Sequence, residues 1–420
     1  MFSLAREEKW IKISLLVLSA IFFSISLYAV LRYGDSNFLG SLDKMNNDDV
    51  KYIRSAWTFL DTGMLTYQNA DEPTVFIMPG LPLTLAFFMS VFGKIEGITA
   101  FRIFQVILQT FSLFLVFFIG RKTFNSRVAI MACGLNLFYV AEFYAATLIL
   151  TEVIFKFLLL LLVYISFYAV EEKRTRYYVL GGLVWGAACL FRPTIAAYPA
   201  VIFVIWLIKR YTLREMFKYT VITLTIFSAV LSPWWIRNDK IYDRFIPLTL
   251  SSGNPFLQGT YVNYDQSKDY TNYTIGKTEI ESNQNQMNAG IDRLKTYGVK
   301  EPLKYLYWYT LGKSFYLWRI PFYWKEILGV PIIAAAIFHV IILGMAVAGI
   351  IRSFKGKDKR FTLTFTVIVY FNLIYLPYYA FERYAYPVMP FVMIFAAFTI
   401  LEFFKKRWGR FRGEAEGSYC

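Results

Sequence analysis

The chain has 420 residues, of which 57% are hydrophobic and 17% charged, whereas about a quarter of an ordinary soluble domain is charged. Apolar runs of about twenty residues recur along the whole chain, and each can cross a hydrocarbon core of ~30 Å. This composition excludes a soluble enzyme and predicts an all-α polytopic membrane protein. The formal net charge of +15 lies mainly in the connections between the apolar runs, so it does not indicate a nucleic-acid partner.

The first apolar run, residues 11–31, lacks the small-residue cleavage site of a signal peptide, so we expect it to remain as a membrane anchor. The run at 81–92 is short for a span, and we predict a re-entrant or interfacial helix there. With the first run, the sequence predicts about ten transmembrane helices, the others being 98–120, 127–147, 149–170, 177–191, 194–208, 215–235, 327–351, 361–379 and 385–404.

Lys and Arg are concentrated in one set of connections, which predicts the cytoplasmic side of the membrane. These connections are the N-terminus, 121–127, 171–176, 209–218, 351–360 and 405–416. Both termini are then cytoplasmic, and any chemistry is expected in the two outer loops. The predicted divisions are an N-terminal transmembrane module (1–235) that contains the first outer loop (32–97), a second outer loop (236–326), C-terminal transmembrane helices (327–404) and a cytoplasmic tail (405–420).

The residue types limit the chemistry that is available. His339 is the one histidine, and the chain has three cysteines. One histidine and three cysteines are too few for a Ser-His-Asp triad with further histidine chemistry, for an HExxH zinc site or for a disulfide framework, so these sites are excluded. We expect no metal site and no cofactor, and any catalysis must use carboxylates, Lys, Arg or Tyr.

The first outer loop contains an acid pair, Asp48 and Asp49, directly before a helical pattern that ends at residues 61–63. Acids at a helix N-terminus are favoured by the macrodipole and by capping, so the pair fits a plain N-terminal cap. The same position also suits a general base. A carboxylate outside the membrane, close to Lys51 and Arg54, would stay ionised and could take a proton from an incoming hydroxyl. The spacing alone leaves both interpretations open.

Further motifs follow the acid pair in a fixed order. They are Asp48-Asp49-x-x-Tyr52, Gly63, Pro79-Gly80-x-Pro82, Arg102, the stretch 146–152 that ends in Glu152, Leu190-Phe191-Arg192-Pro193-Thr194, Pro233-Trp234-Trp235-Ile236-Arg237-Asn238, and Arg383-Tyr384-x-x-Pro387-x-x-Pro390. This ordered set resembles the C-type (GT-C) integral-membrane glycosyltransferases, in the branch of the protein O-mannosyltransferases and lipid A aminoarabinose transferases. The resemblance covers residues 1 to about 405. Family members with a large soluble C-terminal domain extend well beyond this point.

The resemblance implies a GT-C-like bundle of about ten transmembrane helices with juxtamembrane helices in the first outer loop. It also implies a hexosyl- or pentosyltransferase of the cell envelope that moves a sugar, with inversion, from a polyprenyl-phosphate donor to a lipid, glycan or protein acceptor. The reaction would take place on the outer side of the plasma membrane. By resemblance Asp48 is the catalytic base, and substrate-binding residues are expected at Asp49, Lys51, Tyr52, Glu152, Arg192, Arg383 and Tyr384.

Each of these positions has a simpler interpretation. Arg192 could pair with a lipid phosphate or reach the headgroups, and Glu152 could be a plain interfacial acid. Arg383 could pair with Glu382, and Lys51 could belong to a solvated helix face. At the level of function, a flippase or transporter of lipid-linked sugars is the main alternative, and a membrane scaffold without catalysis is a third.

Overall fold

A computed structural model describes residues 2–267 and 270–417, with side chains as far as residue 405. In that part of the chain every regular element is a helix and no strand occurs, as the composition predicts. Each helix satisfies its own backbone hydrogen bonds, which is the condition for crossing lipid.

Six helical segments among the described residues are long and apolar enough to cross a membrane. They are α1 (Lys9–Tyr33), α4 (Glu96–Thr123), α7 (Glu152–Glu172), α10 (Leu213–Tyr242), α15 (Ile332–Lys355) and the segment Glu382–Lys405, most of which belongs to α17 (Met389–Gly417). The other predicted runs form a bent pair and three shorter helices, α8 (Thr175–Cys189), α9 (Pro199–Ile208) and α16 (Thr362–Tyr375). The chain is therefore a multi-pass membrane protein.

The run at 127–147 is predicted as one span, and in the structure it is a bent pair of helices. The residues form α5 (Ser126–Phe138) and α6 (Ala141–Thr147), which are bent by 58° at the break between them. Tyr139, at the break, leaves the helical region with φ −89° and ψ 92°. Its hydroxyl lies 2.9 Å from Nδ1 of His339 on α15, and this contact ties the break to the neighbouring helix.

The first outer loop contains two juxtamembrane helices, as predicted. α2 (Asp48–Thr62) begins after Asn47, whose side chain accepts a hydrogen bond from the Asp48 N–H. The N-cap is therefore Asn47, and the acid pair occupies the first turn. The helix ends at Gly63, whose φ of 76° is a left-handed conformation that glycine adopts without strain. α3 (Gly80–Phe92) is the short apolar helix.

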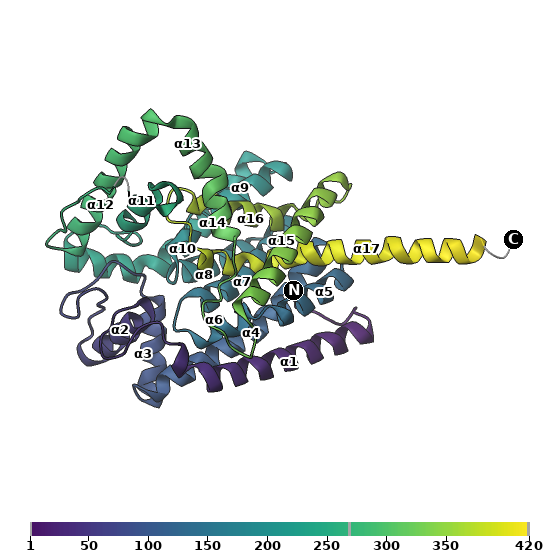
Figure 1. Cartoon of the computed structure of the whole chain (residues 1–420), viewed down its shortest axis with the longest axis horizontal. Coiled ribbons are helices and arrows are strands. Elements are labelled where there is room, and N and C mark those ends of the chain that lie inside the picture. Colours follow the sequence, from purple (N-terminus) through teal and green to yellow (C-terminus); the bar gives the residue numbers. More distant parts are fainter. Residues whose placement is uncertain (1, 268–269, 418–420) are drawn as a thin grey trace.

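The second outer loop is largely helical, although the sequence indicates no motif in it. Its helices are α11 (Gly253–Gly259), α12 (Glu279–Arg293), α13 (Pro302–Tyr307) and α14 (Lys313–Trp318). In Figure 1, α2, α3, α11 and α12 gather at one end of the molecule, and α17 extends from the other. The predicted tail at 405–420 overlaps the end of α17, and residues 418–420 lie outside the described residues.

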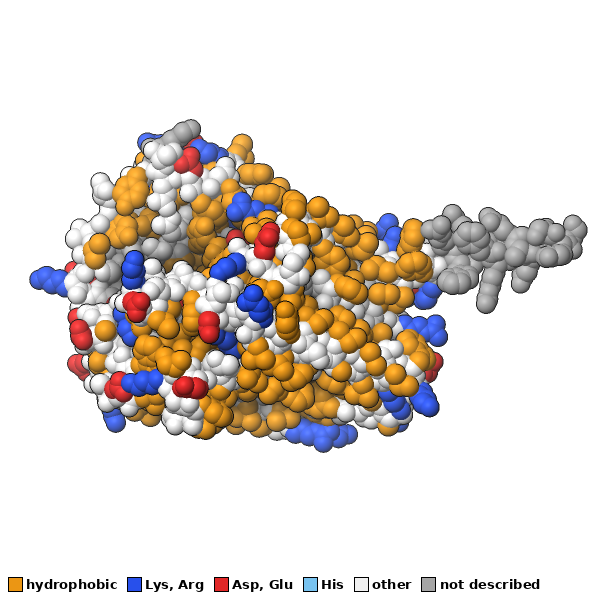
Figure 2. Space-filling view, turned by 60° about the horizontal axis from the view of Figure 1, so that its bottom comes forward, with side chains coloured by type: hydrophobic (Ala, Val, Ile, Leu, Met, Phe, Trp, Pro, Cys, Tyr) orange, Lys and Arg blue, Asp and Glu red, His pale blue; other side chains and the backbone are white. Residues whose placement is uncertain are grey.

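The flank of the bundle is hydrophobic. Figure 2 shows apolar side chains over a broad flank, with most charged side chains in view nearer its two ends. α7 lies in the interior, with 78% of its most apolar stretch buried, whereas α10 buries 17% of its own. An apolar exterior of this extent is stable in contact with lipid.

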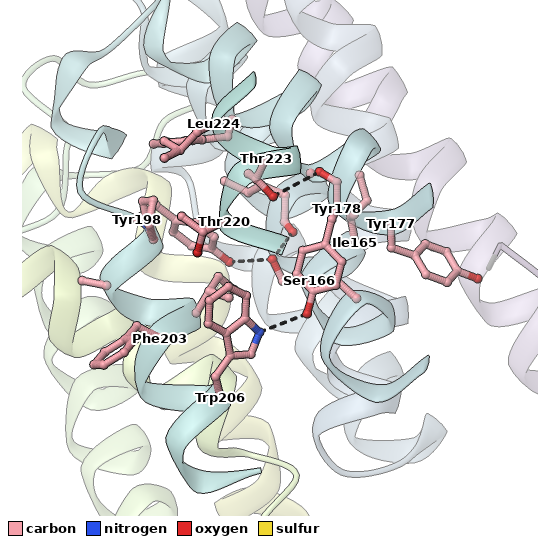
Figure 3. A pocket seen from close by; sticks show the side chains of 17 residues that line it. Ile165, Ser166, Tyr177, Tyr178, Tyr198, Phe203, Trp206, Thr220, Thr223 and Leu224 are labelled. Carbon is pink, nitrogen blue, oxygen red and sulfur yellow. Dashed lines mark hydrogen bonds between the residues drawn. The ribbon is translucent and has the colours of Figure 1, made fainter. Parts of the chain in front are cut away.

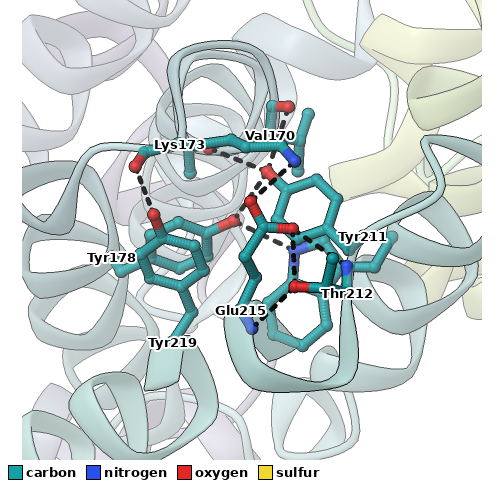
Figure 4. A network of polar contacts seen from close by, with 9 residues as sticks. Val170, Lys173, Tyr178, Tyr211, Thr212, Glu215 and Tyr219 are labelled. Carbon is teal, nitrogen blue, oxygen red and sulfur yellow. Dashed lines mark hydrogen bonds and ion pairs between the residues drawn. The ribbon is translucent and has the colours of Figure 1, made fainter. Parts of the chain in front are cut away.

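Two predicted cytoplasmic turns, after α7 and before α10, are joined by a polar network (Figure 4). Nζ of Lys173 lies 2.8 Å from Oε1 of Glu215. The Tyr211 hydroxyl donates to the Val170 carbonyl oxygen at 3.1 Å and accepts a hydrogen bond from the Tyr178 hydroxyl at 3.1 Å. These contacts hold the ends of α7, α8 and α10 together.

Candidate active site

Asp48, the predicted base, lies in the first turn of α2 with both carboxylate oxygens engaged. The Tyr67 hydroxyl donates to Oδ1 at 2.8 Å, and Nη2 of Arg383 donates to Oδ2 at 3.0 Å. The side chain of Asp48 is still 37% exposed. The fold thus places a reachable carboxylate of the first outer loop against an arginine that is 335 residues away in the sequence.

Four charged side chains of alternating sign form a row that starts at Asp48. Nε of Arg383 lies 3.6 Å from Oε1 of Glu152, and the same oxygen accepts a hydrogen bond from Nη1 of Arg192 at 3.1 Å. The exposed fraction of the side chain falls from 37% at Asp48 to 17% at Arg383 and 3% at Glu152. Asp48 is therefore the end of the row that a substrate can reach.

Tyrosine rings enclose this row of charges. The guanidinium carbons of Arg192 and Arg383 lie 4.8 Å and 5.4 Å from the centroid of the Tyr384 ring. A guanidinium over an aromatic face is stabilised by the quadrupole of the ring. Tyr52 packs against Tyr67, with 5.2 Å between the ring centroids. The site is thus walled by flat rings beside two cations, which could attract an anion.

The pKa of Asp48 is set by opposing effects. Burial raises it, but attraction to Arg383, the hydrogen bond from Tyr67 and the charge of Lys51 outweigh burial and hold the pKa below its ordinary value. Burial raises the pKa of the Tyr67 phenol well above its ordinary value, so this hydroxyl remains a proton donor to the carboxylate. Asp48 is consequently ionised at neutral pH.

This lowered pKa predicts how stability responds to acid. A carboxyl group whose pKa is lower in the folded state stabilises the fold above its unfolded pKa, near 3.8, and loses that contribution as the pH falls through the folded value. We expect the unfolding midpoint of the wild type to fall below about pH 4 more steeply than that of Asp48→Asn. Thermal unfolding in detergent across this range measures both slopes, and parallel slopes would contradict the assignment.

Other predicted site residues point elsewhere. The Asp49 carboxylate is fully buried and accepts hydrogen bonds from the backbone N–H groups of Leu39 at 2.6 Å and Gly40 at 3.2 Å. It thereby fastens the chain that precedes α2. Nζ of Lys51 donates to Oε1 of Gln68 at 2.7 Å. The structure thus brings six of the predicted residues together, namely Asp48, Tyr52, Glu152, Arg192, Arg383 and Tyr384, and a role for Asp49 and Lys51 in substrate binding stays a prediction.

Two of the sequence motifs meet through their backbones. The Gly80 N–H, in the Pro-Gly-x-Pro turn, donates to the carbonyl oxygen of Leu190 at 2.7 Å. A Cβ atom at Gly80 would lie 2.4 Å from that oxygen, so this approach requires glycine. Leu190 lies two residues before Arg192. The contact therefore fixes the turn that presents Arg192 to Glu152.

Gly80→Ala is accordingly expected to lower the free energy of unfolding by about 1–3 kcal/mol, because the backbones must separate to admit the methyl group. A denaturant titration in detergent measures the change. Gly134→Ala is the matched control, since a Cβ atom there meets nothing within 4 Å and the substitution lies within α5. We expect that control to be neutral or stabilising by up to about 1 kcal/mol. Equal effects of the two variants would contradict the close approach.

Three residues in or beneath this site were not predicted from the sequence. Tyr67 hydrogen bonds to Asp48, while Glu142 and Lys156 form a buried ion pair. In a membrane protein, a single Glu or Lys within an apolar run usually pairs with another group or serves a function. This rule, applied to Glu142 and Lys156, would have indicated the ion pair from the sequence. Among the described residues, no group of three or more His, Cys, Asp or Glu side chains could hold a metal ion.

A cavity of about 370 Å³ lies between α7, α8, α9 and α10 (Figure 3). Its wall is mainly apolar and aromatic and includes Leu162, Ile165, Trp185, Phe203, Trp206 and Leu224. Nε1 of Trp185 donates to the Ile195 carbonyl oxygen at 2.9 Å, three residues after Arg192. The wall of the cavity is thus joined to the turn that carries one of the two site arginines.

This fold is similar to solved membrane glycosyltransferases. ArnT from Cupriavidus metallidurans bound to undecaprenyl phosphate matches with a TM-score of 0.57 and 14% identity, over 98% of this chain and 64% of that chain. The oligosaccharyltransferase of Archaeoglobus fulgidus in the apo form matches with a TM-score of 0.56 and 12% identity, over 98% of this chain and 53% of that chain. Both have the GT-C fold, and this chain shares it, which confirms the predicted fold class and the resemblance to C-type glycosyltransferases.

Within this class, residues 71–236 match the family model described as dolichyl-phosphate-mannose-protein mannosyltransferase. That stretch includes Glu152 and Arg192 and leaves Asp48 and Arg383 outside. AglB from Archaeoglobus fulgidus, in complex with an inhibitory peptide and a dolichol-phosphate, matches with a TM-score of 0.56 and 13% identity, over 97% of this chain and 52% of that chain. The chain thus spans 64% of ArnT and about half of the archaeal enzyme. No curated protein matches the sequence significantly.

Proposed function

We propose that the protein is a glycosyltransferase that moves a hexosyl or pentosyl group from a polyprenyl-phosphate donor to a lipid, glycan or protein acceptor. The reaction takes place on the extracytoplasmic side of the plasma membrane. The proposal rests chiefly on the contact between Asp48 and Arg383, because it places an ionised, reachable carboxylate beside a cation within a GT-C fold. The row of charges then supplies both a base and a site for an anion.

The reaction is a single displacement. Asp48 takes the proton of the acceptor nucleophile, which attacks the anomeric carbon as the bond from that carbon to the phosphate oxygen breaks. The electron pair of that bond leaves with the polyprenyl phosphate. Arg383 and Arg192 stabilise the negative charge on the leaving phosphate. Attack from the side opposite the phosphate inverts the anomeric configuration, and no glycosyl-enzyme forms.

Three observations support a lipid-linked donor. The cavity between α7, α8, α9 and α10, whose wall is joined to the Arg192 turn through Trp185, is lined by apolar and aromatic side chains, which suits the chain of a polyprenyl phosphate better than water. Arg192 itself is 90% buried, and a second anion near it would offset the cost of placing two arginines together. Two solved proteins with this fold are bound to undecaprenyl phosphate and to a dolichol-phosphate.

The test is release of free polyprenyl phosphate by the purified protein from a panel of polyprenyl-phosphate sugars. We expect release with at least one donor, and inverted configuration in the glycoside product. A sugar trapped covalently on Asp48 would refute single displacement. No release from any donor, even with membranes of the source cell supplied as acceptor, would favour a flippase or transporter of lipid-linked sugars, since transport consumes no donor.

A further inference from the structure

A second polar cluster lies beneath the row of charges, in the interior of the bundle. It joins Glu142 of α6, Lys156 of α7 and Tyr386 of the short helix η7 (Tyr386–Val388). Nζ of Lys156 donates to Oε2 of Glu142 and, at 2.9 Å, to the Tyr386 hydroxyl. That hydroxyl donates to Oε2 of Glu142 at 2.8 Å and accepts a second hydrogen bond from Nε2 of Gln109 at 3.0 Å. Its one proton and both lone pairs are used.

Burial makes this cluster costly. The side chains of Glu142 and Lys156 are 1% and 2% exposed. Removing two ions from water costs several kcal/mol each, and well-packed hydrophobic residues often replace such a pair without loss of stability. Ionisable groups within a membrane bundle usually serve a function for this reason. Stability alone therefore gives no account of why the cluster is present.

The cluster is linked to the site above it by short stretches of chain. Lys156 lies one helical turn after Glu152 on α7, so the two side chains share a face of the helix. Tyr386 lies three residues after Arg383, and consecutive tight turns join them, with the Ala385 N–H bonded to the Glu382 carbonyl oxygen at 3.1 Å. A shift of the Tyr386 hydroxyl would move this turn relative to α7.

The position of Arg383 itself needs such support. Its Nε lies 3.6 Å from Glu152, which is too long for a hydrogen bond, and Nε has no hydrogen-bond partner among the described residues. Among the described residues the guanidinium makes one hydrogen bond, to the partly exposed Asp48, beside the longer ion pair with Glu152 and the contact with the Tyr384 ring. The backbone that carries Arg383 must therefore be held from below if the side chain is to stay between the two acids.

We propose that Glu142, Lys156 and Tyr386 are positioning residues that lock the turn of Arg383 against α7 and so set Arg383 between Asp48 and Glu152. The cluster touches no substrate and acts through Arg383. The contact between Arg383 and the donor phosphate rests on the proposed function. The positioning of Arg383 by the cluster does not depend on that function. The two parts can be tested separately.

The first test needs no substrate and uses a double-mutant cycle on the unfolding midpoint of the full-length protein. Tyr386→Phe removes the hydroxyl and keeps the ring, whose centroid lies 5.7 Å from that of Phe322. If the cluster positions Arg383, the change in midpoint caused by Asp48→Asn should shrink to less than half in the Tyr386→Phe background. Tyr164→Phe, which removes the hydroxyl of a buried tyrosine on α7, is the control and should leave the effect of Asp48→Asn unchanged. An undiminished effect beside Tyr386→Phe overturns the proposal.

The second test measures binding of undecaprenyl phosphate as the probe. Tyr386→Phe should weaken binding at least fivefold in the wild-type background and less than twofold in the Arg383→Ala background, because the hydroxyl acts through that arginine. Equal losses in both backgrounds would indicate a general structural role and overturn the proposal. If the wild type neither binds the probe nor releases polyprenyl phosphate from any donor, the proposed function fails, and the unfolding cycle still decides whether the cluster positions Arg383.

Discussion

Asp48→Asn is expected to lower the turnover of the polyprenyl-phosphate donor by about 10²- to 10⁴-fold, the range by which a positioned general base accelerates a reaction. The amide keeps the size of the carboxylate and can still accept the hydrogen bond from Tyr67. It cannot take a proton from the acceptor. Release of free polyprenyl phosphate by wild type and variant, at matched amounts of folded protein, measures the loss.

Asp61→Asn provides the matched control for this prediction. Asp61 lies on the same helix, in its last turn, and pairs with Lys94 at 2.7 Å in a largely exposed ion pair. Removing that pair changes stability by at most about 1 kcal/mol and should leave turnover intact. Retained turnover in Asp48→Asn would move the base elsewhere. Asp49 and Glu152 would then be the next candidates, although the buried Asp49 carboxylate faces backbone N–H groups.

Glu152→Gln is expected to lower the free energy of unfolding by about 3–5 kcal/mol, the cost of breaking a buried ion pair from one side. Glu152 is the one carboxylate within ion-pair distance of Arg192 among the described residues. Without its charge, the buried guanidinium of Arg192 has no compensating anion, and Arg383 loses one of its two acidic neighbours. A denaturant titration in detergent measures the change. Donor turnover is expected to fall as well, because both arginines are released from their positions.

The control for Glu152→Gln lies at the other end of the same helix. Glu171 pairs with Lys122 at 2.6 Å, but its side chain is 31% exposed. Glu171→Gln should therefore change the free energy of unfolding by about 1 kcal/mol or less. If Glu152→Gln lowered the free energy of unfolding by no more than this control does, Glu152 would not hold the row of charges together. The proposed phosphate site at the two arginines would then lose its support.

Much of the fold could be predicted from local patterns. Each predicted apolar run corresponds to helix in the structure, because the preference of a segment for lipid depends on its own side chains. The run at 127–147 is helical too, but it is bent by 58° near Tyr139, whose hydroxyl contacts His339, 200 residues away. Hydropathy carries no information about such a contact. The helix α2 was likewise predictable from its acids and from Gly63, which act within one or two turns.

The sequence by itself determined the class of protein, the helices and the individual residues in which to look for chemistry. The tertiary structure alone decided which of those residues meet. It joined Asp48 to Arg383 and Glu152 to Arg192, turned Asp49 toward the backbone at Leu39, and placed Lys156 against Tyr386. Helix formation follows from neighbours a few residues apart, whereas these pairs depend on how separate helices pack, which no local pattern specifies.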